Sequence, residues 1–372
     1  MAKTEKITYK NSKKKIIFII WTQAHYHFFK NAIKELSEKN EIIILARSCK
    51  NIERLFQQGE LKYEIVAAQY DNLFLKVLGY VKSIFKIFLK ILRIRPKLII
   101  GVGSTGGALA SFFLRIPSIM YEDDEITTYQ QITYVPFVDH IIVPEKFRRC
   151  FGKKEIRLWG YKELAYLHPN RFSPNKTILV QYGLSVGDTY TIIRLNPWNA
   201  YHDTGQKGIS IRYLKDLVST FSQYGKVLLS TEKVLPKEYS TLLIRNPSHI
   251  HHLLYYASLL FSDSQTMSTE GAILGVPVIR FNSFVGKNDM SNFIELEKDY
   301  GLIFNIKDAQ LAKKKAVELL QQKDVKRIWN NKKKLLYRNK IDVTGFLIWL
   351  IENYPQSVRK LQKNPDYQLN FK

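Results

Sequence analysis

Short apolar segments alternate with segments of helical period along most of this 372-residue chain. Apolar runs of strand length lie at 16–21, 41–46, 63–67 and 98–102, and helical patterns separate them. The first of these patterns predicts a helix at 28–39. Continuous apolar strands joined by helices form parallel sheets that are covered on both faces. The same alternation starts again at residue 190, so the sequence predicts an α/β fold with two Rossmann-like, doubly wound domains. Ligands bind such sheets at the carboxyl ends of the strands, which predicts a central cleft that the two domains face.

Four residues that disfavour regular structure interrupt the pattern between 166 and 188, namely Pro169, Pro174, Gly183 and Gly187. We expect the interdomain linker there, because a chain of this length is comfortable as two domains. The predicted domains are therefore 1–169 and 170–340. The remaining segment, 341–372, contains an amphipathic helix predicted at 343–352.

Basic residues strongly outnumber acidic ones, with 57 Lys and Arg against 33 Asp and Glu and a formal charge of +24. Such a surplus attracts nucleic acid, an acidic membrane or a phosphorylated substrate; a Lys-rich source proteome is the alternative explanation. No zinc finger, helix-turn-helix or aromatic RNA platform is visible, so nucleic acid is not an expected partner. Cys49 and Cys150 offer no disulfide framework, and no segment reaches membrane-spanning length without charges. We expect a cytoplasmic protein, which can also lie at the inner face of the membrane.

One long predicted helix, at 72–92, is apolar on most of its surface and carries a row of basic residues. These are Lys76, Lys82, Lys86, Lys90 and, just beyond the helix, Arg93. A helix of this kind can lie on an anionic membrane, which predicts a peripheral membrane contact. The other interpretation is a core helix whose lysines form its solvated edge. The sequence leaves both open.

The most informative polar segment runs from Asp263 to Ile279, directly after the apolar run 259–261. It has the pattern of a buried strand, a polar turn, a short helix and a second strand. A helix that starts at such a turn offers unpaired N–H groups and the positive end of its dipole to an anion. Glu270 lies one helical turn further along and suits the hydroxyls of a ribose. We therefore predict a site for a nucleoside-diphosphate sugar whose binding residues are Ser264, Gln265, Thr266, Met267, Ser268 and Glu270.

Candidate acid–base residues follow two other predicted strands. His25 comes directly after the first strand, where an imidazole can act as a base; alternatively it caps or packs against the next helix. Glu122 is the best candidate among the four acids at 122–125, either as a base or sugar contact, or as part of a solvated turn. No third ligand accompanies His25 and His27 at a suitable spacing, so we expect no metal site.

A glycine-rich turn at 101–107 follows the strand predicted at 98–102. Ser104 and Thr105 begin the next helix and are candidate substrate contacts, because a turn of this kind can cradle a phosphate. The spacing is not that of a dinucleotide fingerprint. Tight packing of the helix on the strand explains the glycines equally well.

The segment 194–205 follows the first strand of the second half. Arg194 can bind a phosphate through its planar guanidinium. Trp198 can stack on a base or a sugar, or it fills a hinge. His202, beside Asp203, is the third candidate for a catalytic residue, although neighbours on a loop need not meet.

Together these segments resemble the domain-of-unknown-function family 354 (DUF354), within the superfamily of GT-B glycosyltransferases and UDP-N-acetylglucosamine 2-epimerases. The match rests on four blocks, which lie at 24–30 (AHYHFFK), 160–167 (GYKELAYL), 194–208 and 254–277. The resemblance implies a GT-B-like fold with the acceptor on the N-terminal domain and the nucleotide on the C-terminal domain. It also implies that the last helix packs back on the N-terminal domain, that Ser264 contacts diphosphate and that Glu270 contacts ribose.

Two departures from the epimerase pattern bear on the reaction. Gln265 and Thr266 stand where epimerases have two glycines, and Ser104 stands where they have an acid. Glu122 is similar to another epimerase acid, and His202 is a loose match to a further one. The resemblance therefore implies a nucleotide-sugar enzyme while weakening the assignment as an epimerase.

The favoured hypothesis is a sugar-nucleotide-dependent, metal-independent glycosyltransferase of GT-B type in surface-polysaccharide assembly. It uses a UDP-linked donor, a lipid-linked or saccharide acceptor and no cofactor. His25 or Glu122 removes the acceptor's proton, while the turn at 264–268 and Arg194 stabilise the leaving diphosphate. A UDP-N-acetylglucosamine 2-epimerase and a non-catalytic nucleotide-sugar-binding protein are the alternatives.

Overall fold

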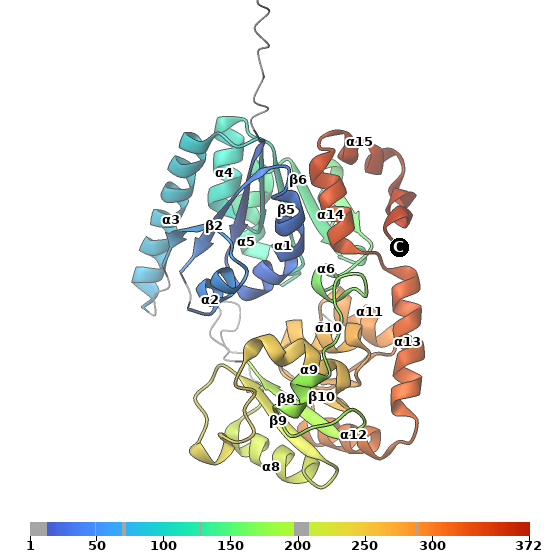
Figure 1. Ribbon diagram of the computed structural model, residues 1–372. Helices are drawn as coiled ribbons and strands as arrows, with labels where there is room; N and C mark the ends of the chain where they lie inside the picture. The colour runs from blue at the N-terminus through green and yellow to red at the C-terminus, as the bar shows by residue number, and fades with distance from the viewer. Residues whose placement is uncertain (1–12, 49, 69–71, 127, 197–207, 287–288) are drawn as a thin grey trace, which may run out of the picture. The chain divides into compact units, whose positions relative to one another are not determined.

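The computed structural model describes residues 13–48, 50–68, 72–126, 128–196, 208–286 and 289–372 (Figure 1). Contacts within the chain define two compact units. Unit 1 comprises residues 1–122, 129–142 and 151–156, and unit 2 comprises 123–128, 143–150 and 157–372. The domain boundary placed after residue 169 and the position of 341–372 against the N-terminal domain stay predictions.

Unit 1 is built on a seven-stranded sheet with the strand order β3-β2-β1-β4-β5-β6-β7. The strands are β1 (Lys15–Ile20), β2 (Glu41–Arg47), β3 (Tyr63–Ala67), β4 (Leu98–Val102), β5 (Ser118–Tyr121), β6 (His140–Pro144) and β7 (Glu155–Leu158). The central strand β1 pairs in parallel with β2 and β4, and Ile17–Ile20 are fully buried. A strand that is apolar at every position needs cover on both faces, which the helices between the strands provide.

The helices of unit 1 are α1 (Gln23–Leu36), α2 (Lys50–Gln58), α3 (Leu73–Ile94), α4 (Thr105–Leu114) and α5 (Thr128–Tyr134). The helix that the sequence pattern predicts at 28–39 begins earlier, because the Thr22 side chain accepts the N–H of His25 and caps the helix. His25 therefore lies in the first turn of α1. Helix α3 packs beside α4 and ends at Arg95, which has the left-handed conformation, directly before Pro96 (Figure 1).

Unit 2 contains a second parallel sheet, of five strands in the order β12-β11-β10-β8-β9. These strands are β8 (Tyr190–Leu195), β9 (Lys226–Thr231), β10 (Leu259–Ser262), β11 (Val278–Arg280) and β12 (Ile303–Asn305). The carboxyl ends of β8, β10 and β11 lie side by side, since Arg194, Ser262 and Arg280 share one register. The predicted fold class, two parallel sheets with alternating helices, is confirmed.

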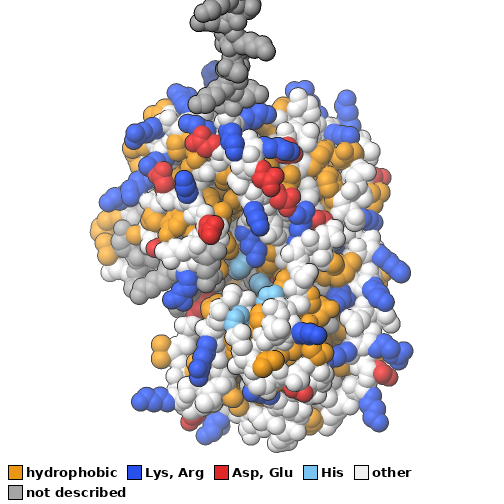
Figure 2. All heavy atoms as spheres, in the orientation of Figure 1, with side chains coloured by type: hydrophobic (Ala, Val, Ile, Leu, Met, Phe, Trp, Pro, Cys, Tyr) orange, Lys and Arg blue, Asp and Glu red, His pale blue; other side chains and the backbone are white. Residues whose placement is uncertain are grey.

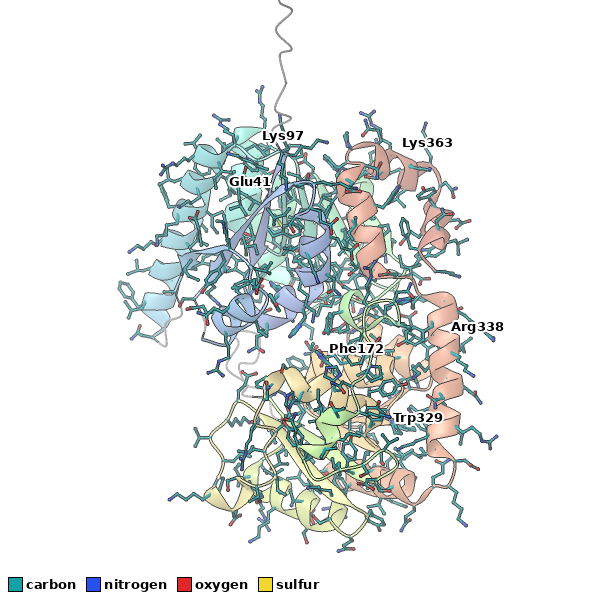
Figure 3. All side chains as sticks on the ribbon, in the orientation of Figure 1. Glu41, Lys97, Phe172, Trp329, Arg338 and Lys363 are labelled. Atoms are coloured by element: carbon teal, nitrogen blue, oxygen red, sulfur yellow. The ribbon has the colours of Figure 1, made fainter. Side chains whose placement is uncertain are left out.

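The longer helices of unit 2 follow the strands or form its C-terminal part. They are α8 (Ile211–Phe221), α9 (Ile250–Tyr256), α10 (Gln265–Leu274), α11 (Ser291–Lys298), α12 (Ala309–Gln321), α13 (Val325–Asn339), α14 (Val343–Glu352) and α15 (Gln356–Lys363), and the short helices α6 (Leu164–Leu167) and α7 (Thr177–Val180) precede them. From α13, Trp329 points into the unit and donates to the Leu302 carbonyl at 2.9 Å (Figure 3). Helix α14 occupies the range that the sequence predicts as amphipathic helix.

None of the helices in the described part of the chain combines the length and the hydrophobicity that crossing a lipid bilayer requires.

Candidate functional site

The turn after β10 is organised by serines. Ser264 caps α10: its hydroxyl accepts the N–H of Met267 at 3.4 Å, and its carbonyl accepts the hydroxyl of Ser268 at 2.7 Å. The backbone N–H of Ser264 donates to Ser262 Oγ at 3.0 Å. Gln265 and Thr266 are half-buried at the first positions of the helix, whose N–H groups have no partners inside the helix. The turn thus has the form of an anion site at a helix N-terminus.

Asp263 is fully buried beside this turn and binds the backbone on both sides of the segment that joins β8 to α8. Its Oδ1 accepts the N–H of Asn196 at 2.6 Å, and its Oδ2 accepts the N–H of Ile209 at 3.0 Å. The chain therefore leaves β8 and returns toward α8 at the same carboxylate, next to Ser264. Trp198 and His202 lie outside the described residues, between these two anchors.

Glu270, at 5 % exposure on α10, is fixed by two donors from other helices. Its Oε1 accepts the hydroxyl of Tyr166 at 2.7 Å and is 3.0 Å from Nε2 of His251. Burial acts to raise the pKa of the Glu270 carboxyl, but His251, Tyr166 and Arg194 outweigh burial and lower it. Glu270 is thus an oriented carboxylate, and Oε2 is the oxygen without a hydrogen bond to any residue of the described chain.

Arg194 lies near the end of the neighbouring strand β8. Its guanidinium donates to Ser230 Oγ at 3.2 Å and to Glu232 Oε1 at 3.1 Å, both on the side of β9. The buried Nε of Arg194 has no partner among the residues that the structure describes. Because the cation acts on the pKa of Glu270, the guanidinium belongs to the same electrostatic site as α10.

A second charged cluster surrounds the start of α6. Lys162 Nζ is bonded to Asp123 Oδ2 and lies 3.7 Å from Glu163 Oε1, and the Glu163 side chain is 4 % exposed. Burial raises the pKa of the Glu163 carboxyl to about 7, against the lowering effect of Lys162 and with a further rise from Asp123 and Glu270. The cluster therefore holds a buried carboxyl that titrates near neutral pH, in the electrostatic range of Glu270.

Glu163→Gln should make the pH dependence of stability shallower. Because the folded-state pKa of about 7 exceeds the ordinary 4.5, ionising Glu163 costs the folded protein free energy as pH rises through this window. The variant avoids that cost, so its free energy of unfolding relative to wild type should increase by about 2 kcal/mol between about pH 5 and pH 8. Urea unfolding across this range measures the difference.

The matched control for this prediction is Glu41→Gln. Glu41 is an exposed carboxylate at the start of β2 (Figure 3), so its replacement should change the free energy of unfolding by no more than about 0.5 kcal/mol. A difference between Glu163→Gln and wild type that does not change with pH would show that Glu163 is ionised normally in the folded protein.

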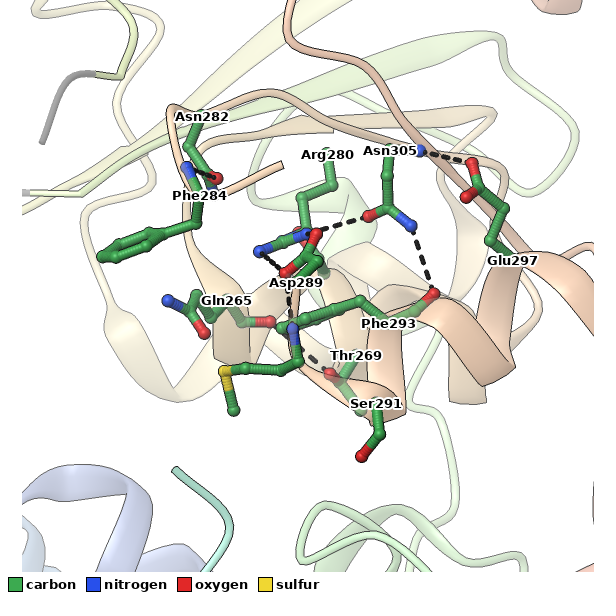
Figure 4. Close-up of polar contacts among 12 residues, drawn as sticks. Gln265, Thr269, Arg280, Asn282, Phe284, Asp289, Ser291, Phe293, Glu297 and Asn305 are labelled. Atoms are coloured by element: carbon green, nitrogen blue, oxygen red, sulfur yellow. Dashed lines mark hydrogen bonds and ion pairs between the residues drawn. The ribbon is translucent and has the colours of Figure 1, made fainter. Parts of the chain in front are cut away.

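A buried ion pair between Arg280 and Asp289 joins the end of β11 to the start of α11. Arg280, the last residue of β11, is fully buried and donates to Asp289 at 2.6 and 3.0 Å and to Asn305 at 2.9 Å (Figure 4). Its guanidinium carbon lies 3.7 Å above the centre of the Phe293 ring. The close-up shows this network beside Gln265 on α10, so the pair fixes the strand end and the start of α11 next to the candidate site.

In unit 1, the predicted residues follow the neighbouring strands β1, β4 and β5. The Nδ1 of His25 accepts the backbone N–H of Trp21 at 3.3 Å. A backbone N–H can only donate, so Nδ1 presents a lone pair and the neutral ring carries its proton on Nε2. Glu122 is buried after β5 and accepts a hydrogen bond from the hydroxyl of Tyr134.

Ser104 and Thr105 begin α4 with their hydroxyls engaged. Ser104 Oγ accepts the N–H of Gly107 at 3.2 Å, and Thr105 Oγ1 bonds Tyr80 and Thr133 at 2.7 Å each. A Cβ on Gly107 would lie 2.5 Å from Ile19 Cδ1, so glycine lets α4 approach β1 without displacing that side chain. Both hydroxyls thus organise unit 1; their predicted contact with substrate stays a prediction.

The described residues include no group of three or more His, Cys, Asp or Glu side chains placed to hold a metal ion.

Sequence reasoning missed Tyr166, His251, Lys162 and Glu163 as site residues. Tyr166 and Glu270 are 104 positions apart, and no local pattern connects them. The family resemblance marks the block 160–167, but it gives these residues no role. One further signal was available, namely that this block places a lysine and a glutamate on a segment of mostly apolar and aromatic residues.

Comparison with known proteins agrees with this architecture. The family described as "Protein of unknown function (DUF354)" matches residues 15–338. An uncharacterized protein of Methanocaldococcus jannaschii is 23 % identical over 266 residues, which cover 68 % of this chain and 78 % of that protein.

Solved structures share the fold at low sequence identity. A putative UDP-N-acetylglucosamine 2-epimerase from Listeria monocytogenes superposes with a TM-score of 0.64 at 13 % identity, covering 93 % of this chain and 97 % of the other. The Streptomyces glycosyltransferase SsfS6, complexed with thymidine diphosphate, superposes with a TM-score of 0.59 at 11 % identity, covering 91 % and 99 %. The chain therefore belongs to the DUF354 family and has the GT-B-like fold of these sugar-nucleotide enzymes.

Proposed function

We propose that the protein is a sugar-nucleotide-dependent glycosyltransferase of GT-B type that acts in the cytoplasm in surface-polysaccharide assembly. The observation that carries the proposal is the oriented carboxylate of Glu270, one helical turn beyond the anion-binding end of α10. We assign the diphosphate to this turn and the ribose to Glu270, which both lie on α10. The fold is shared with a putative UDP-N-acetylglucosamine 2-epimerase and with a glycosyltransferase complexed with thymidine diphosphate, which supports the same assignment.

In this proposal unit 2 stabilises the leaving group. When the bond between the sugar and the nucleoside diphosphate breaks, negative charge develops on the diphosphate. The N–H groups at the start of α10 are donors suited to that charge, and the Arg194 guanidinium, which also lowers the pKa of Glu270, adds positive potential. Ser264, Gln265, Thr266, Met267 and Ser268 form the diphosphate turn, and Oε2 of Glu270 accepts a ribose hydroxyl.

Glu122 is the preferred base in this proposal, and it removes the proton from the acceptor hydroxyl. His25 carries its own proton on Nε2 while Nδ1 accepts the Trp21 N–H, so the neutral ring can donate at Nε2 but cannot accept there. Glu122 is a buried carboxylate held by Tyr134. The neutral ring of His25 is therefore not the base in this proposal.

UDP should raise the thermal stability of the full-length protein. A ligand at about 100 times its dissociation constant stabilises the folded state by about 2.7 kcal/mol. Differential scanning fluorimetry should show a saturable rise for UDP, a smaller one for UMP and none for uridine, because the turn binds phosphate. If UDP, thymidine diphosphate and other nucleoside diphosphates all leave the melting temperature unchanged, the proposal loses its basis.

A 2-epimerase is the second candidate, because the Listeria structure of the same fold carries that name. An epimerase acts on UDP-N-acetylglucosamine alone, whereas a transferase needs an acceptor. NMR of the sugar nucleotide in deuterium oxide separates the two. We expect no deuterium at the sugar carbon, and its incorporation would assign the epimerase. UDP binding with no turnover of the sugar nucleotide, with or without saccharide acceptors, would favour a binding protein.

A further inference from the structure

Helix α3 of unit 1 presents a continuous apolar face to solvent. Six residues at helical spacing form this face, and their exposed fractions are 70 % for Phe74, 50 % for Leu78, 52 % for Val81, 67 % for Phe85, 56 % for Leu89 and 37 % for Leu92. The spacing of three and four places them on one side of the helix. Ser83, Ile87 and Ile91 are buried on the opposite side, so packing of the unit already uses the other face.

The neighbouring helix α4 also exposes bulky apolar side chains. Phe112 and Phe113 are 56 % and 65 % exposed there, and α3 packs against α4. In Figure 2, hydrophobic side chains lie interspersed with basic ones at the edge of unit 1 that α3 forms in Figure 1. Apolar patches of this extent on a soluble protein mark an interaction site.

A row of positive charge borders the apolar face. Lys82, Lys86 and Arg93 are exposed and lie on the flank next to Phe85 and Leu89 by the same helical spacing. The 22 residues of α3 contain no acidic side chain. A helix with bulky apolar residues on one side and lysines along the boundary matches the chemistry of an anionic lipid surface, whose headgroups meet the lysines while the apolar residues enter the acyl boundary.

We propose that α3 docks the protein on an anionic phospholipid bilayer. The helix lies in the plane of the interface and does not cross it. A second copy of the chain fits the face less well, because pairing two such faces brings the basic rows of Lys82, Lys86 and Arg93 together without a counter-charge. The inference goes beyond the proposed reaction and does not depend on nucleotide binding.

Vesicle sedimentation with the full-length protein tests the proposal. Wild type should bind vesicles that contain phosphatidylglycerol, bind pure phosphatidylcholine vesicles weakly, and release from the former as salt is raised. Phe85→Ser with Leu89→Ser should reduce the affinity at least about tenfold, since each bulky apolar group contributes by burial. Lys82→Glu with Lys86→Glu should do the same and should also flatten the salt dependence.

Matched controls on unit 2 distinguish this surface from general stickiness. Val234→Ser removes an apolar side chain that is 99 % exposed, and Lys237→Glu with Lys314→Glu reverses two exposed charges. Both should bind vesicles as wild type does. Thermal melting checks that every variant is folded, and exposed substitutions on α3 should leave it unchanged.

Three results would overturn the proposal. Wild type that does not sediment with anionic vesicles lacks the function, and α3 variants that bind as well as the controls place the contact elsewhere. A wild-type dimer that the Phe85→Ser, Leu89→Ser variant converts to a monomer, with no vesicle binding by either, would make a second copy the partner. Nucleotide binding is tested separately, by the effect of UDP on the melting temperature. A failure of the proposed enzymatic function therefore does not affect the vesicle experiment.

Discussion

Glu270→Ala should weaken UDP binding by about 10- to 100-fold, the range expected when a hydrogen bond to a charged group is lost. The substitution removes the carboxylate that we assign to the ribose. It also leaves the hydroxyl of Tyr166 and Nε2 of His251 without their shared acceptor. Unsatisfied buried groups cost about 1–3 kcal/mol, so the variant should unfold at lower urea as well. Isothermal titration with UDP and urea unfolding measure the two effects.

Glu295→Ala is the matched control for loss of a buried carboxylate. Glu295 lies in the same unit at 5 % exposure and accepts from Lys340 Nζ at 2.6 Å and the Tyr161 hydroxyl at 2.5 Å. Its removal should lower stability by a comparable or larger amount and leave UDP affinity at the wild-type value. If the two variants bind UDP equally well, Glu270 is a structural residue and not a ligand-binding one.

Asp289→Ala should destabilise the protein more than any of the other single substitutions, with a cost of about 3–5 kcal/mol. Arg280 is fully buried, and Asp289 supplies both oxygens that neutralise it. The variant leaves that guanidinium charged and unpaired in the interior of unit 2. The N–H of Met290 also loses its acceptor, Oδ1 of Asp289, at 2.8 Å. The midpoint of urea unfolding should fall accordingly.

An exposed ion pair provides the control for this effect. Arg327 and Asp324 pair at 3.5 Å, with side chains that are 74 % and 64 % exposed, so Arg327→Ala should change stability by no more than about 0.5 kcal/mol. Replacing the whole buried pair by Arg280→Met with Asp289→Leu should recover much of the lost stability, because no unpaired charge remains. Asp289→Ala with the stability of Arg327→Ala would mean that Arg280 is hydrated or neutralised in another way.

The elements with unbroken apolar pattern could be predicted from the sequence alone. Strand β1, helix α3 and helix α14 lie close to the ranges expected from hydrophobic periodicity, because each has one dominant way to bury its apolar face. The predicted start of α1 was wrong, at residue 28 where the helix begins at Gln23. The helix begins where the Thr22 hydroxyl accepts the N–H of His25, whereas the apolar pattern becomes clear only at the aromatic residues further along.

Only part of the polar site could be predicted from the sequence. The turn at Ser264 and the position of Glu270 follow from local pattern, since a strand, a cap and a helix of ten residues are contiguous in the chain. The partners of Glu270 are not local: Tyr166 and His251 come from α6 and α9. Asp263 likewise joins Asn196 and Ile209 across more than fifty positions. Such pairings depend on how the strands are ordered in the sheet, which periodicity does not encode.

A crystal structure of the full-length protein with UDP tests the central claim most directly. We predict that the diphosphate accepts hydrogen bonds from the N–H groups at the start of α10 and that a ribose hydroxyl donates to Oε2 of Glu270. A UDP molecule bound elsewhere on the chain, with the turn at Ser264 unoccupied at saturating nucleotide, would contradict the account.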